Sequence, residues 1–127
     1  MSVEKHKIEL EFELKTSLTS ITNAMTTPSG LSEWFCDDVN INREVYTFIW
    51  NNEEESAKLL KRTATSFKLQ WLDDKETNYY FQFKYKLSEL TKSIILNITD
   101  FAEEDEIEET KELWENQIAD LKNSIGG

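Results

Sequence analysis

The chain has 127 residues, of which 39% are hydrophobic, and its 25 acidic and 14 basic side chains give a formal net charge of −11. This length suits a single domain over residues 1–127, and the charge would repel DNA, RNA and anionic lipid headgroups. We therefore predict no nucleic-acid partner. We also predict no membrane insertion, because no window approaches the roughly 18 apolar residues that cross a bilayer. The first residues lack the basic start and apolar block of a secretory signal, so a cytoplasmic location is expected.

The first predicted elements are a strand and two short helices. Residues 8–14 alternate strictly between apolar and charged side chains, which is typical of an antiparallel strand with one buried face. Ser17 can cap a helix whose apolar residues recur at helical spacing. Pro28 must end that helix by about Thr27, because proline offers the next turn no amide donor. Residues 30–35 fit a second short helix after the break.

The middle of the chain is a series of short β-like runs, each closed by polar turn residues, with no helical period between them. The runs cover residues 45–50, 56–72, 77–87 and 92–101. The second run is either one long bent strand or two consecutive strands. Because each run is expected to pair with the one before it, a meander is the simplest topology.

The last segment changes to a helical period. Its apolar stripe is formed by Ile107, Trp114, Ile118, Leu121 and Ile125. The acidic run over 102–109 suits the positive end of the helix dipole, and we interpret it as capping and solvation. A calcium loop would instead need acids at alternate positions around a glycine turn. The economical arrangement is an α+β fold, in which a curved antiparallel sheet wraps around this helix.

Signatures of catalysis are scarce in this sequence. His6, the single histidine, stands among charges, and Cys36 lies beside Asp37 and Asp38, which raise a thiol pKa and oppose thiolate formation. The phosphate-binding patterns GxxxxGK(S/T) and GxGxxG do not occur. We therefore predict no catalytic residue, no metal site and no cofactor. The best outlier is Asp100, for which a cap of the last helix is favoured over an acid–base role.

The stretch MTTPSGLSEWF, residues 25–35, resembles the LTdPegLseWf stretch of the START-like superfamily. That superfamily, also called SRPBCC, includes the birch-pollen-allergen fold and bacterial homologues of the activator of the heat-shock-protein-90 ATPase. SFKLQWLDD and WENQIADLKNSI stand where those homologues have an aromatic-ended strand and a tryptophan-bearing last helix. The resemblance implies a helix-grip fold with an apolar cavity between the concave sheet face and the long helix. The activators' basic RKGK-like stretch has no counterpart here, so chaperone activation is not carried over.

On this resemblance we expect a non-enzymatic domain that binds a small hydrophobic or lipid-like ligand between the sheet and the C-terminal helix. The candidate lining residues are Trp34, Tyr46, Trp71, Tyr79, Phe81, Phe83, Trp114 and Ile118. Trp34 is either a lid at the cavity mouth or a staple that holds the short helices to the sheet. A small-molecule pocket needs roughly 300 Å³, and the many inward-facing aromatic rings could fill that space themselves.

Two other functions stay open. A protein–protein interaction module, monomeric or homodimeric and with or without a chaperone partner, would have a filled core and would use the outer face of the sheet. Apolar residues interrupt the polar pattern expected there, at Val45, Ile49, Leu60, Leu72 and Ile95. A small cyclase-like enzyme would need a polar group with a shifted pKa inside the cavity. Enzymatic activity is thus undecided, with a non-enzymatic role favoured, and the sequence fixes neither the ligand nor the oligomeric state.

Overall fold

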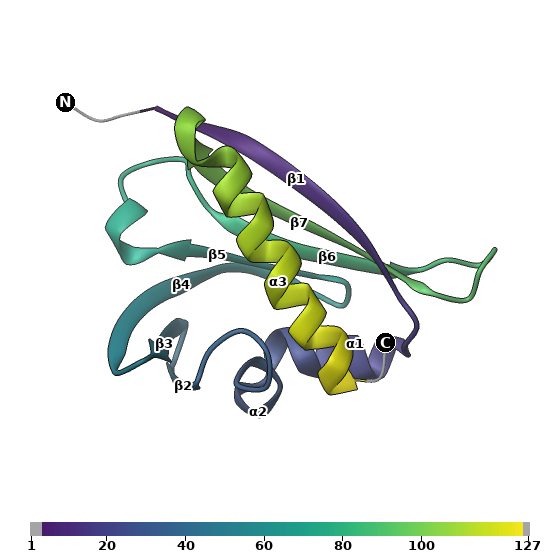
Figure 1. The fold of residues 1–127 in the computed structure, drawn as a ribbon. Helices are drawn as coiled ribbons and strands as arrows, with labels where there is room; N and C mark the ends of the chain where they lie inside the picture. The colour runs from purple at the N-terminus through teal and green to yellow at the C-terminus, as the bar shows by residue number, and fades with distance from the viewer. Residues whose placement is uncertain (1–3, 126–127) are drawn as a thin grey trace.

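A computed structural model describes residues 4–125 of the chain. Within these residues the chain forms a seven-stranded antiparallel sheet, which curves around one long helix and carries two short helices after its first strand (Figure 1). This is the expected helix-grip α+β fold. No helix in the described part of the chain is long and apolar enough to span a membrane.

The strands and helices follow the predicted order. The strands are β1 (Lys5–Leu14), β2 (Asp38–Asn42), β3 (Val45–Trp50), β4 (Glu53–Thr63), β5 (Ser66–Trp71), β6 (Phe81–Leu87) and β7 (Ile94–Glu103). The helices are α1 (Leu18–Thr26), α2 (Pro28–Leu31) and α3 (Ile107–Ile125), with 3-10 turns η1 (Leu72–Asp74) and η2 (Glu104–Glu106). The sheet order is β1-β7-β6-β5-β4-β3-β2, so β2 to β7 form the predicted meander and β1 pairs with β7.

The structure differs from the sequence prediction around β2 and β4. The edge strand β2 was not predicted: Val39 and Ile41 do alternate with polar residues, but the run has only five residues and Val39 is its one buried side chain. The run 56–72 is two strands, and β4 begins at Glu53, within a stretch assigned to a turn. The turn itself is short. Asn51 and Asn52 adopt φ values of 48° and 71°, in the left-handed region where asparagine is enriched.

The break between α1 and α2 is built around Pro28. This residue begins α2, where its missing amide hydrogen breaks no hydrogen bond, so the second helix starts earlier than the predicted residue 30. The hydroxyl of Thr27 caps α2 by accepting a hydrogen bond from the amide of Gly30 at 3.0 Å. A Cβ added to Gly30 would lie 2.0 Å from a backbone oxygen of α1. The two helices therefore pack too closely for any other residue at this position.

The core fills the space between the concave sheet face and α3. Phe48 from β3, Phe67 from β5, and Phe81 and Phe83 from β6 are fully buried. From the predicted stripe of α3, the residues Trp114, Ile118 and Leu121 are buried against them. In Figure 1, α3 crosses the sheet and its C-terminal end lies beside α1.

Candidate functional site

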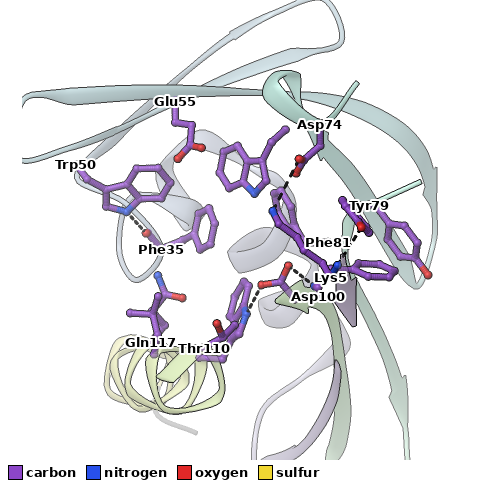
Figure 2. Close-up of a pocket in the computed structure, with 15 residues that line it drawn as sticks. Lys5, Phe35, Trp50, Glu55, Asp74, Tyr79, Phe81, Asp100, Thr110 and Gln117 are labelled. Carbon is purple, nitrogen blue, oxygen red and sulfur yellow. Dashed lines mark hydrogen bonds and ion pairs between the residues drawn. The ribbon is translucent and has the colours of Figure 1, made fainter. Parts of the chain in front are cut away.

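A cavity of about 480 Å³ lies between the first half of α3 and the end of the sheet near η1 (Figure 2). Its volume exceeds the roughly 300 Å³ of a small-molecule site. The helix contributes Thr110, Leu113, Trp114 and Gln117 to the wall. The second half of α3 instead packs Ile118 and Leu121 into solid core. The concave face is thus filled at one end and hollow at the other.

Four of the eight candidate lining residues meet at this cavity. These are Trp71, Tyr79, Phe81 and Trp114. The structure places the other four, Trp34, Tyr46, Phe83 and Ile118, in the buried core outside the cavity wall. Tyr46 and Phe83 lie on the concave face, as the alternation along their strands indicates. They lie in the part of that face that is packed with core side chains and not at the cavity. Strand periodicity identifies the face of a side chain and not its position along that face.

Trp34 and Phe35 have separate roles. Trp34 is 5% exposed, and its indole nitrogen donates a 2.8 Å hydrogen bond to the carbonyl of Ala24 in α1. This is the position of the staple. Phe35 lines the cavity, with its ring centroid 5.4 Å from that of Trp50 and 5.9 Å from that of Trp114. The helix break therefore delivers Phe35 to the cavity, while Trp34 secures the break itself.

The hairpin of β3 and β4 supplies two lining residues that were not among the candidates, Trp50 and Glu55. Trp50 alternates in phase with Phe48, so the strand pattern held a signal for it. Its ring centroid lies 6.1 Å from that of Trp71, and its indole nitrogen donates to the carbonyl of Phe35. Glu55 stands opposite Phe48 in the strand register and so shares the concave face. Its assignment to a turn concealed this orientation.

Asp100 lies in the cavity wall and does not cap the last helix, so that prediction was wrong. β7 continues past it to Glu103, and α3 begins only at Ile107. One carboxylate oxygen of Asp100 accepts a 2.9 Å hydrogen bond from the indole nitrogen of Trp114, and the other accepts a 2.8 Å bond from the amide of Phe101. Burial raises the pKa of Asp100 above its ordinary value, and these two hydrogen bonds oppose the rise.

The remaining charged residues of the wall are Glu55, Asp74 and Lys5. Glu55 is exposed at the rim of the cavity, and partial desolvation there, followed by the nearby charges of Asp73 and Asp74, raises the pKa of its carboxyl, while Lys5 opposes the rise. The ammonium of Lys5 lies 3.9 Å from a carboxylate oxygen of Asp74 and 5.4 Å from the centre of the Tyr79 ring. Three carboxylates thus face one ammonium around the cavity, as Figure 2 shows for Glu55, Asp74, Asp100 and Lys5.

Two other groups were considered for chemistry. Burial raises the pKa of the Cys36 thiol to about 12, and the charges of Asp38 and Asp37 add to this, which agrees with the inert thiol expected. Within residues 4–125, the acids that come together closely enough to share a metal ion are Glu103, Asp105 and Glu106. They stand at the start of the last helix, where solvated acids complement the helix dipole.

The comparisons with known proteins agree with this architecture. A family model described as a START-like superfamily domain matches residues 1–127. No curated protein matches the chain. A solution structure from Bacteroides fragilis is 37% identical, with a TM-score of 0.67, and the match covers 95% of this chain and 91% of that one.

Two more distant structures show the fold alone. The Aha1 dimer from Colwellia psychrerythraea is 18% identical, with a TM-score of 0.80 and coverage of 94% of this chain and 96% of that one. A crystal structure from Bacillus thuringiensis is 11% identical, with a TM-score of 0.80 and coverage of 96% and 100%. Given the hollow between sheet and helix and a family match over its whole length, this chain belongs to the START-like superfamily.

Proposed function

We propose that this START-like domain binds a small, largely hydrophobic molecule in the cavity between the sheet and α3. The observation that carries the proposal is a cavity of about 480 Å³ into which three of the chain's four tryptophans project, namely Trp50, Trp71 and Trp114. Ligand sites are mostly apolar hollows with a few polar groups that orient the ligand. Here Asp100, Glu55 and Gln117 are such groups.

A dye-binding experiment tests the proposal. N-phenyl-1-naphthylamine is uncharged and fluoresces in apolar surroundings, so the protein should bind it saturably with one-to-one stoichiometry. Thr110→Trp places a large ring at the cavity wall and should weaken binding about tenfold or more, because the ring occupies the ligand's space. Glu112→Trp adds the same ring to the same helix at an exposed position outside the wall, and it should bind like the parent. The absence of saturable binding, or equal losses in both variants, would contradict the proposal.

A catalytic role is the second candidate, supported by Asp100 and Glu55. Both are carboxyl groups at an aromatic cavity, and the pKa of each is raised. General acid–base catalysis uses carboxyl groups whose pKa is shifted upward in this way, toward neutral pH. The distinguishing observation is turnover. If the parent protein converts a bound ligand and Asp100→Asn does not, the protein is an enzyme. Recovery of the intact ligand from the parent protein supports a binding domain.

The interaction-module alternative draws on the outer face of the sheet. Leu60 in β4 is 45% exposed, and Leu72, which lies in η1 beyond the end of β5, is 40% exposed. Val45, Ile49 and Ile95 are only partly exposed, so this face offers less apolar surface than the sequence pattern suggested. Sedimentation over a concentration series tests this role, since a strictly monomeric chain would count against a homodimer through this face.

A further inference from the structure

The charges and hydrogen-bond donors in the cavity wall indicate which kind of hydrophobic ligand the cavity favours. This inference rests on the proposed binding function. Lys5 is the one cationic side chain of the wall, and Asp74 already pairs with it at 3.9 Å. Among residues 4–125, neither Glu55 nor Asp100 has a cationic group within ion-pair distance. The charge of Lys5 opposes the rise of the pKa of both carboxylates from a distance, but its ion pair is with Asp74, so neither carboxylate has an ion-pair partner of its own among these residues.

The hydrogen bonds of Asp100 come from neutral donors. The indole of Trp114 and the amide of Phe101 each hold one oxygen, which fixes the carboxylate in place with lone pairs left over. Neither donor carries a positive charge that would neutralise the Asp100 carboxylate. A partly buried carboxylate without an ion-pair partner keeps part of its desolvation cost, and a cation supplied by a ligand would reduce that cost.

The tryptophan rings favour the same charge. The indole nitrogen of Trp50 donates to the carbonyl of Phe35 and that of Trp114 donates to Asp100, so these donors are committed to the protein. The π-faces of the two rings remain as possible ligand contacts. These faces attract cations, and tryptophan does so more strongly than the other aromatic residues. A ligand carboxylate would instead meet two like charges, although the indole nitrogen of Trp71, for which the described part of the chain shows no hydrogen bond, offers it one neutral donor.

We propose that the cavity selects a hydrophobic amine, an apolar molecule with one cationic nitrogen that sits between Asp100 and Glu55 against the tryptophan faces. Figure 2 shows Glu55 and Asp100 reaching the cavity from opposite sides; Glu55 belongs to β4 and Asp100 to β7, and β5 and β6 lie between these strands in the sheet. The apolar body of the ligand then covers Phe81 and Trp71, whose rings stack 4.8 Å apart. Fatty acids and other hydrophobic anions are excluded by the same carboxylates.

Three octyl compounds of different charge test this selectivity. Octyltrimethylammonium, octanol and octanoate compete with bound N-phenyl-1-naphthylamine, the two ions below their micelle concentrations and octanol below its solubility limit. The permanent cation should displace the dye at about tenfold lower concentration than octanol. It has no N–H to donate, but it gains Coulombic attraction to the two carboxylates and cation–π contact with the tryptophan faces. Octanoate should be the weakest competitor.

Neutral variants of the carboxylates identify the cause. Asp100→Asn and Glu55→Gln should each reduce the preference for the cation over octanol severalfold. Glu54→Gln removes the same charge from the neighbouring position of β4, outside the wall, and should keep the full preference. This control matters because a chain of net charge −11 attracts cations without any site. If Asp100→Asn fails to fold, Glu55→Gln still tests the site from the exposed rim.

The outcomes separate the two proposals. If octanol displaces the dye and the cation does so no better, the amine assignment fails and the binding function stands. If Glu54→Gln lowers the preference as much as Glu55→Gln, the preference comes from net charge and the assignment fails as well. If the dye does not bind at all, the binding function itself fails.

Discussion

Trp34 supplies a hydrogen bond that Pro28 cannot. In a continuous helix the carbonyl of Ala24 would accept from the amide four residues later, which is position 28, and proline has no amide hydrogen. The indole of Trp34 donates to that carbonyl at 2.8 Å instead, and both residues are buried. Trp34→Phe removes the donor and leaves a buried carbonyl unpaired. This loss should cost about 1–3 kcal/mol of unfolding free energy beyond the packing lost with the smaller ring.

Urea unfolding measures this cost, with Trp71→Phe as the control. That variant makes the same change in ring size at a partly buried residue for which the structure shows no indole hydrogen bond. Trp34→Phe should therefore be the more destabilised of the two, by about 1–3 kcal/mol at an unchanged m-value. A loss no greater than that of Trp71→Phe would refute the assignment of Trp34 as a replacement donor.

Three further predictions concern Gly30, Asp100 and Cys36. Gly30→Ala should lower the unfolding free energy by about 2 kcal/mol or more, measured by urea unfolding, because its Cβ would meet a backbone oxygen at 2.0 Å; an unchanged midpoint would show that α2 shifts without cost. Asp100 has a folded-state pKa above its unfolded value of 3.8, so its ionised form destabilises the fold at neutral pH and this cost disappears as pH falls toward about 4. The stability of the parent relative to Asp100→Asn should therefore rise as pH falls from 8 to 4, and a flat difference would contradict the raised pKa. The thiol of Cys36, with a pKa of about 12, should react with a thiol reagent at pH 8 only upon unfolding, and rapid labelling of the folded protein would contradict its burial.

The sequence predicted the sheet, the helix break and the last helix because each follows from a local period or a local breaker. Its alternation also placed Trp71 and Phe81 on the concave face, and both line the cavity. Alternation does not indicate where along that face a residue lies. Tyr46 was therefore predicted to line the cavity as well, although it is buried in the core. The cavity depends on where α3 crosses the sheet, which is a property of the whole fold.

The charged part of the site was harder to predict for a different reason. In an acidic chain most carboxylates are solvated, and Glu55 stands in a run of three glutamates that resembles a turn. Asp100 precedes the last helix closely enough to suggest a cap. Its role becomes visible only when Trp114 reaches back across 14 positions to donate to it. Such long-range pairing has no local sequence signature.

The first half of α3 lines the cavity and the second half packs into the core, so substitutions in the two halves have different effects. Thr110, Leu113 and Gln117 touch the hollow, whereas Ile118 and Leu121 hold the helix to the sheet. Changes at the first three can resize or repolarise the compartment while the anchoring residues stay as they are. On the proposed binding function, ligand preference could therefore change through substitutions in the first half of α3, while the second half keeps the helix packed on the sheet.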